Sequence, residues 1–339
     1  MRSIVYEENG PASVLRLIER EPADPGSGEV RVRVVVSGVN PTDWKSREGS
    51  VRTVNGMSVP DQDGAGVIDA IGPDVTDFAV GDRVWVSMAA ATDPMAGTAQ
   101  DVIVLPVQRV HQLPDGVSFD VGASLGVPAI TAHRALTMTE GWPDRLAPGS
   151  LAGATVLVAG GAGAVSHAAI QLARWAGATV IATVSSEEKG RLATAAGAQH
   201  VVNYREDGAA ERIREIAPDG VDTIVDVAVT QNAELDAAVL KPAGTIAIYA
   251  TNPGDRFVVD IRVFMTLNAR MQFVLLYTIP TDALDAAVAD ITAALPAMPV
   301  GEEAGLPLHR FPLEETSKAH DAVEAGAVGK VLIDLAPGA

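Results

Sequence analysis

The stretch VLVAGGAGAVSHAAIQLARWAGATVIATVSSEEK, Val156–Lys189, decides the fold because it reads as strand, glycine-rich turn, helix and second strand. Gly160, Gly163 and Ser166 occupy the three glycine positions of a G-x-x-G-x-x-G turn between an apolar run and an alanine-rich helical segment. A turn in this context is typical of the dinucleotide-binding Rossmann fold, where the pyrophosphate meets backbone amides at a helix N-terminus. We expect the backbone of the turn to hold the pyrophosphate through Gly160, Gly161, Ala162, Gly163, Ala164 and Val165.

The end of the second strand indicates which dinucleotide is bound. Sites for NAD usually place Asp or Glu there to bind the ribose hydroxyls, whereas this chain has Ser185 and Ser186. An acid would repel a 2′-phosphate, but these hydroxyls and Lys189 can bind it, and Tyr204 and Arg205 could close over the same group. The sequence therefore favours NADPH, the alternative being that Lys189 and Arg205 are solvated surface charges.

Composition narrows the class of protein. The chain has 339 residues, 25 Lys and Arg against 43 Asp and Glu, and a net charge of −18, which disfavours nucleic acid and anionic lipid as partners. No cysteine is present, which excludes disulfides and cysteine-ligated zinc, and the six histidines lie far apart in the sequence. We therefore expect no metal site. The charged N-terminal stretch MRSIVYEENG does not fit a signal peptide, so we expect a cytoplasmic protein.

The hydrophobic pattern predicts an α/β protein of two domains. Up to about residue 126, short β-rich runs separated by turn residues indicate an antiparallel, barrel-like domain. From about residue 150 to 278, six apolar strands alternate with helical segments and predict a doubly wound parallel sheet. The C-terminal part reads as helix, loop, helix and strand. We expect it to rejoin the first domain, which gives a first domain of 1–126 and 280–339 and a Rossmann domain of 127–279.

These features together resemble the medium-chain dehydrogenase/reductase superfamily and its zinc-free quinone oxidoreductase branch, the zeta-crystallin-like family. The glycine turn is joined by SGVNPTDWK, VPDQDGAGVIDAIG, GDRVW, LGVPAITAHRAL and GKVLIDL, all in the order and spacing of the family. The resemblance covers almost the whole chain and implies a GroES-like catalytic domain joined to a Rossmann domain.

The resemblance also assigns residues to the site. Zinc-dependent relatives place cysteine, histidine and cysteine where this chain has Asn40, Gln62 and Val127, so no Lewis acid is expected. Asn40, Asp43 and Gln62 should face the substrate side, although Asp43 could equally make a structural hydrogen bond. Further residues implied to line the nicotinamide ribose and phosphates are Thr131, Val227, Ala228, the rest of the loop to Thr230, Tyr249, Ala250, Thr251, Leu275, Leu276, Tyr277 and Lys330.

The chain also departs from the family pattern. The loop SREGSVRTVNGMSVP lacks the tyrosines that some quinone and enoyl reductases carry there, Asp61 replaces a usual glycine, and His133 stands where a tyrosine is often found. A hydroquinone anion can take its proton from water, so the missing tyrosine favours quinones over enoyl thioesters as substrates.

The leading hypothesis is an NADPH-dependent quinone oxidoreductase. The alternatives are an NADPH-dependent reductase of α,β-unsaturated ketones or aldehydes, and a non-catalytic NADPH-binding, crystallin-like or RNA-binding protein. The apolar stretch Met271–Tyr277 should form the outermost strand of the sheet, and an open edge of this kind predicts a homodimer through it, as in relatives of the family.

Overall fold

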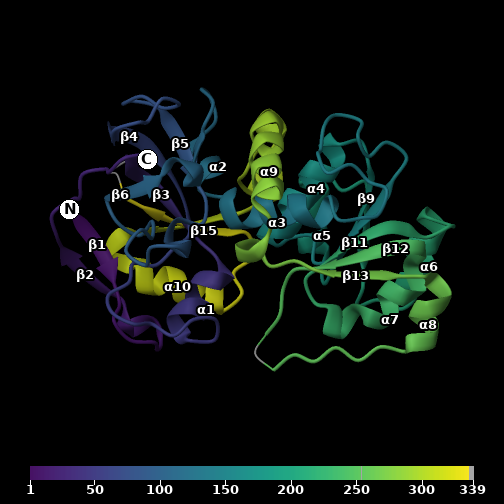
Figure 1. The fold of residues 1–339 in the computed structure, drawn as a ribbon. Helices are drawn as coiled ribbons and strands as arrows, with labels where there is room; N and C mark the ends of the chain where they lie inside the picture. Colours follow the sequence, from purple (N-terminus) through teal and green to yellow (C-terminus); the bar gives the residue numbers. More distant parts are fainter. Residues whose placement is uncertain (253, 336–339) are drawn as a thin grey trace. The chain divides into compact units, whose positions relative to one another are not determined.

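The computed structural model describes residues 1–252 and 254–335, and the chain divides into two compact units. The first unit comprises Met1–Val127 and the chain from Leu308 onward, and the second comprises Pro128–Pro307. In Figure 1 the yellow C-terminal strand β15 lies with the purple and blue strands of the first unit, because it pairs with β3. Among the described residues, no helix has the length and apolar character needed to cross a membrane.

The first unit is built on a seven-stranded, mostly antiparallel sheet in the order β14-β15-β3-β4-β5-β7, with β6 paired to β3. The long strand β3 organises this sheet, since its alternating valines Val30, Val32 and Val34 are all buried in one core. The predicted β-rich domain is therefore confirmed. Its strands are β1 (Arg2–Val5), β2 (Arg16–Glu19), β3 (Glu29–Val39), β4 (Asp63–Ile71), β5 (Arg83–Val86), β6 (Val102–Pro106), β7 (Val110–Gln112), β14 (Leu308–Pro312) and β15 (Lys330–Asp334), and its helices are α1 (Pro41–Glu48), α2 (Phe119–Gly122) and α10 (Thr316–Glu324).

The second unit is built on a six-stranded parallel sheet in the order β10-β9-β8-β11-β12-β13. Chain order reverses between β8 and β11, which is the topological switch point where open α/β sheets bind ligands. The doubly wound sheet was predicted correctly. Its strands are β8 (Thr155–Val158), β9 (Thr179–Val184), β10 (His200–Asn203), β11 (Val221–Asp226), β12 (Leu240–Ile248) and β13 (Arg270–Phe273). The helices are α3 (Gly126–Leu136), which begins at the unit boundary, α4 (Ala164–Trp175), α5 (Glu187–Ala195), α6 (Ala209–Ile216), α7 (Val229–Val239), α8 (Ile261–Leu267) and α9 (Thr281–Ala294).

The structure moves the second domain boundary from residue 279 to residue 307. Helix α9, which we had expected in the first domain, packs in the second unit because its buried Asp290 finds its partners there. The Asp290 carboxylate accepts hydrogen bonds from His133 Nε2 at 2.8 Å, Arg145 Nε at 2.7 Å and the Leu146 amide at 2.7 Å. His133 is thereby a buried core residue that anchors α9.

The outermost strand is shorter than the sequence suggests. Strand β13 ends at Phe273, and Leu276–Thr278 forms a 3₁₀ turn. Val274 and Leu276 turn inward and are buried, while Phe273 and Leu275 are 65% and 58% exposed. The apolar run therefore combines edge residues with core residues, which a hydropathy pattern alone does not separate.

Candidate functional site

The glycine turn after β8 has the backbone shape of a dinucleotide site. Gly160 has φ +66°, a left-handed conformation that glycine adopts without strain, and a Cβ there would lie 3.1 Å from Val227 Cγ1. A Cβ on Gly161 would meet Ala182 and Ala193 Cβ atoms at 2.9 and 3.0 Å. At Gly163, by contrast, the nearest atom would be 3.6 Å away, so the protein itself does not require glycine there. An approaching ligand would require it.

The N-terminus of α4 offers the partial positive charge that would complement a negatively charged pyrophosphate. The amide of His167 is bonded to the Gly163 carbonyl at 2.8 Å, so the three amides before it, from Ala164 to Ser166, have no acceptor within the helix. These amides and the helix dipole favour an anion, and the turn fits the pyrophosphate of a dinucleotide. Ser166 is tolerated at the third glycine position because its hydroxyl donates to the Ala159 carbonyl at 2.8 Å and lies 3.2 Å from the Tyr249 hydroxyl.

Three of the predicted cofactor segments meet in the second unit. Val227, after β11, contacts the glycine turn at Gly160, and Tyr249, after β12, contacts it through Ser166. Burial raises the pKa of the Tyr249 phenol, and the neighbouring Asp226 charge raises it further, so this hydroxyl remains protonated. Other predicted residues lie elsewhere in the unit: Thr131 is buried in α3, Val229 and Leu276 are in the core, Ala250 is half-buried, and Leu275 and Thr251 are exposed.

The predicted 2′-phosphate residues gather at the carboxyl ends of β9 and β10. Ser186 caps α5, with its hydroxyl accepting the Lys189 amide at 3.3 Å. The Tyr204 amide donates to the Val184 carbonyl at 3.0 Å, which places Tyr204 beside the end of β9. Two acids follow Ser186 in the same turn, and the first, Glu187, is paired with Arg191 at 3.2 Å.

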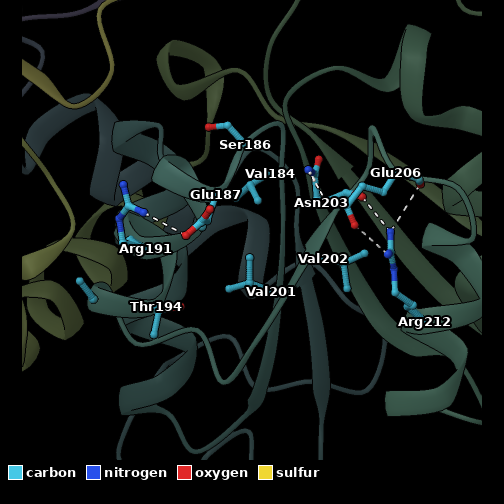
Figure 2. A pocket seen from close by; sticks show the side chains of 12 residues that line it. Val184, Ser186, Glu187, Arg191, Thr194, Val201, Val202, Asn203, Glu206 and Arg212 are labelled. Carbon is cyan, nitrogen blue, oxygen red and sulfur yellow. Dashed lines mark hydrogen bonds and ion pairs between the residues drawn. The ribbon is translucent and has the colours of Figure 1, made fainter.

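A groove of about 720 Å³ adjoins this cluster. Figure 2 shows that it runs along the edge strand β10, with the Glu187–Arg191 ion pair on one side, the Glu206–Arg212 ion pair on the other and Val201 and Val202 between them. Of the predicted cofactor residues, only Ser186 lines it. The groove therefore extends away from the candidate dinucleotide site rather than forming it.

In the first unit, Asn40 is the centre of a buried polar cluster. It is 2% exposed, its Nδ2 donates to Asp63 Oδ2 at 2.7 Å, and its Oδ1 accepts from Lys330 Nζ at 2.7 Å. Lys330 also lies 3.2 Å from Asp63. The structure thus places Lys330 beside the predicted substrate-side residues, with the residue 1% exposed and its ammonium bonded to Asn40 and Asp63.

Asp43 also belongs to this cluster but faces inward. Its Oδ2 accepts the Asn40 amide at 2.7 Å, which completes a capping box at the start of α1, and its Oδ1 is buried without a hydrogen-bond partner among the described residues. Burial and the nearby Asp61 and Asp63 charges raise the pKa of Asp43 well above its usual range. The geometry favours the structural role for Asp43.

Gln62 is the predicted substrate-side residue that retains a donor. Its Oε1 accepts the Ala90 amide at 3.1 Å, which orients the side chain, while its Nε2 makes no hydrogen bond to any residue that the structure describes. Gln62 is half-buried, so this amide group is accessible. Val127 stands at the third position where zinc-dependent relatives are implied to carry a ligand, and its backbone amide donates to Asp63 Oδ1 at 2.8 Å. Over residues 1–252 and 254–335, no group of three His, Cys, Asp or Glu side chains could hold a metal ion.

Three buried acids near the candidate sites of the two units were not assigned a structural role from the sequence. Asp63 begins strand β4 and ties Asn40, Lys330 and Val127 together, and Asp61 is paired with His320 at 3.0 Å. Asp226 ends the buried strand β11. Asp63 at the start of a buried strand and Asp226 at the end of one were visible signals, since buried carboxylates need dedicated partners.

Comparison with known proteins agrees with this geometry. Residues 26–115 match the model of the alcohol dehydrogenase GroES-like domain, and residues 164–293 match that of the zinc-binding dehydrogenases. A quinone oxidoreductase of Lama guanicoe is 31% identical over 99% of this chain and 98% of that protein. The chain belongs to the quinone oxidoreductase family of medium-chain dehydrogenase/reductases.

Other members of the superfamily show its range. A 2-haloacrylate reductase of Burkholderia is 32% identical over 80% of this chain and 78% of that protein. A mycobacterial protein solved in complex with NADPH is 28% identical, with a TM-score of 0.81 over 99% of this chain and 100% of that one. The family therefore includes proteins that bind NADPH and proteins named for the reduction of an activated alkene.

Proposed function

We propose that this family member is an NADPH-dependent oxidoreductase that transfers a hydride to a quinone without a metal. The observation that carries the proposal is the similarity to quinone oxidoreductases along the full chain. NADPH is favoured because Ser185 and Ser186, with Lys189 nearby in α5, follow β9 where an acid would stand in an NAD site, and because a relative of the same fold was solved with NADPH.

The residues of this chain would share the work as follows. The glycine turn and the first amides of α4 bind the pyrophosphate, and Val227 and Tyr249 flank the turn. NADPH, when bound, supplies the hydride. Gln62 donates a hydrogen bond from Nε2 to the acceptor oxygen, on which negative charge develops during hydride transfer. The resulting hydroquinone anion takes one proton from water, so the reaction needs no acidic side chain.

The reduction of activated alkenes is the second candidate function, because a relative of similar identity is named 2-haloacrylate reductase. In that reaction the hydride goes to one alkene carbon and a proton must be delivered to the other. A non-catalytic NADPH-binding protein is the third alternative.

One panel separates these functions. NADPH consumption is followed with simple quinones, with enones and 2-haloacrylate, and with enoyl thioesters. We expect turnover with quinones, and lower kcat/KM with quinones for Gln62→Leu. Turnover confined to alkenes would replace the proposal by the second function, and NADPH binding without turnover of any acceptor would replace it by the third.

A further inference from the structure

Two buried carboxyl groups flank the loop 227–230, which is predicted to line the nicotinamide ribose, and the proposed reaction uses neither of them. Asp226 is the last residue of β11 and is 0% exposed, and Asp236, in α7, is 1% exposed. Because β11 lies beside β8 at the switch point of the sheet, Asp226 lies at the carboxyl end of a strand that borders the expected ligand site. Burying a charged carboxylate here costs free energy, because the carboxylate loses its hydration, unless hydrogen bonds compensate for that loss.

One oxygen of Asp226 shapes the chain that follows. Asp226 Oδ1 accepts the Ala228 amide at 2.8 Å and Asn232 Nδ2 at 2.7 Å. The first of these bonds closes a tight turn across Val227, and the second ties that turn to the first turns of α7. Because Val227 contacts the glycine turn, the position of its side chain depends on the Asp226 carboxylate.

Asp236 lies one helical turn after Asn232 on the same face of α7, which places it on the side of the helix that meets Asp226. Asp226 Oδ2 and Asp236 Oδ2 are both buried without a hydrogen-bond partner among the residues that the structure describes. Burial, the Asp226 charge and a hydrogen bond to Asp226 all raise the pKa of Asp236 well above its usual range. Two carboxylates cannot both stay ionised in contact, and a shared proton resolves the conflict.

We propose that Asp236 is a positioning residue for the cofactor site: as a neutral acid it donates a hydrogen bond to the Asp226 carboxylate, and Asp226 in turn fixes Val227 and Ala228 beside the glycine turn. This inference rests on the proposed function, because it concerns the nicotinamide side of the same dinucleotide site. The Tyr249 phenol, directly after β12, also feels the Asp226 charge, and its hydroxyl lies 3.2 Å from the Ser166 hydroxyl.

The arrangement makes cofactor binding depend on pH in one direction. The pKa of Asp236 is raised in the folded protein, so its contribution to stability is complete below the unfolded pKa and is lost as pH rises through the folded pKa. Once the proton is gone, two buried carboxylates repel each other and the turn at Val227 and Ala228 loses its anchor. NADPH affinity should therefore fall with rising pH, by up to about tenfold per pH unit above the pKa of Asp236.

The test compares Asp236→Asn with Asp236→Ala. Asparagine keeps an N–H donor for Asp226 and cannot lose it, whereas alanine removes the donor. NADPH binding is titrated by fluorescence from about pH 5 to about pH 9, and unfolding of the cofactor-free protein in urea is measured over the same range. We expect Asp236→Asn to bind NADPH as wild type does at low pH and more tightly at high pH, with a flatter stability profile. Asp236→Ala should bind more weakly than wild type at low pH.

Three results would overturn the inference. Equal weakening of NADPH binding in the Asn and Ala variants would show that the donor is irrelevant. An unchanged pH profile in Asp236→Asn would show that another group titrates, and this arm stands even if Asp236→Ala fails to fold. Wild-type NADPH affinity at every pH in both variants would show that Asp236 does not position the site. Absence of NADPH binding by the wild-type protein would instead sink the proposed function itself.

Discussion

Asp61 has φ +75°, a left-handed conformation that is costly for any residue with a side chain. The resemblance to the family implies glycine at this position, which would avoid the strain but would not supply the carboxylate. Asp61 Oδ1 lies 3.0 Å from His320 Nε2 and Oδ2 accepts from the Ser37 hydroxyl at 3.2 Å, with both ionisable partners fully buried. The pair ties the chain beside Gln62 to helix α10.

Replacing Asp61 with glycine separates strain from pairing. Glycine removes a backbone cost of about 1 kcal/mol but leaves His320 buried without its hydrogen-bond partner, which costs about 1–3 kcal/mol, so we expect a net loss of up to about 2 kcal/mol. Asp61→Asn tolerates the same φ and still accepts the His320 hydrogen bond, so it should lose less. Urea unfolding of the three proteins decides this, and a glycine variant at least as stable as wild type would contradict it.

Lys189 should set the preference for NADPH. The residue is half-buried in the first turn of α5, beside Ser186 and in the same turn as two acids, where its ammonium can bind a phosphate. We expect Lys189→Ala to weaken NADPH binding by about tenfold or more while leaving NADH binding unchanged, since one charge-assisted phosphate contact is lost. Arg191→Ala, one half-turn away and paired with Glu187, is the matched control. Equal loss in both variants would point to a general effect of surface charge.

Among the elements, β13 and α8 carry the most unusual surface. Strand β13 pairs only with β12, and its far edge has no strand partner within residues 1–252 and 254–335. Phe273 and Leu275 are exposed at this edge, and Ile261 and Met265 of α8 are 70% and 61% exposed in the same unit. Open strand edges flanked by apolar side chains invite pairing with another chain.

We propose that two copies pair through this edge, and we expect a dimer in sedimentation at micromolar concentration. Phe273→Lys and Leu275→Lys should yield monomers, because each places a charge at the exposed edge. Substitution at Val274 or Leu276 would be uninformative, since both are buried in their own unit. Val80→Lys is the control, as Val80 is 62% exposed in the first unit. A wild-type monomer, or a dimer that survives both edge variants, would contradict the proposal.

The elements that sequence predicted well are those with a local signal. The six parallel strands and the glycine turn follow from apolar periodicity and turn residues within about thirty residues of chain. The Asn40 cluster does not, because Lys330 reaches it only through the pairing of β15 with β3, 290 residues along the chain from Asn40. Strand β14 was read as loop because its residues, LHRFP, are mostly polar or turn-forming, and only its pairing with β15 makes it a strand.

At the scale of the whole molecule, the two units have separate polar centres of different character. The proposed dinucleotide site of the second unit offers backbone amides, and the Asn40 cluster of the first unit consists of side chains around a buried ammonium. Neither centre offers the set of sulfur and imidazole ligands that zinc prefers. The net charge of −18 will nevertheless attract divalent cations loosely to the surface.

Activity should therefore survive removal of metal. Asn40, Gln62 and Val127 stand where zinc-dependent relatives are implied to carry their ligands. Asn40 is hydrogen-bonded to Lys330 and Asp63, the Gln62 side chain is hydrogen-bonded to the Ala90 amide, and Val127 has no ligating side chain. These three residues therefore do not form a site for a divalent ion. We expect quinone reduction to stay within about twofold of its starting rate after exhaustive chelation and desalting. The reason is that a hydrogen bond from Gln62, and not a Lewis acid, polarises the quinone oxygen in the proposed reaction. Elemental analysis before and after chelation separates surface-bound ions from a resident one. Zinc near one equivalent that leaves together with activity, and restores it when added back, would prove this wrong.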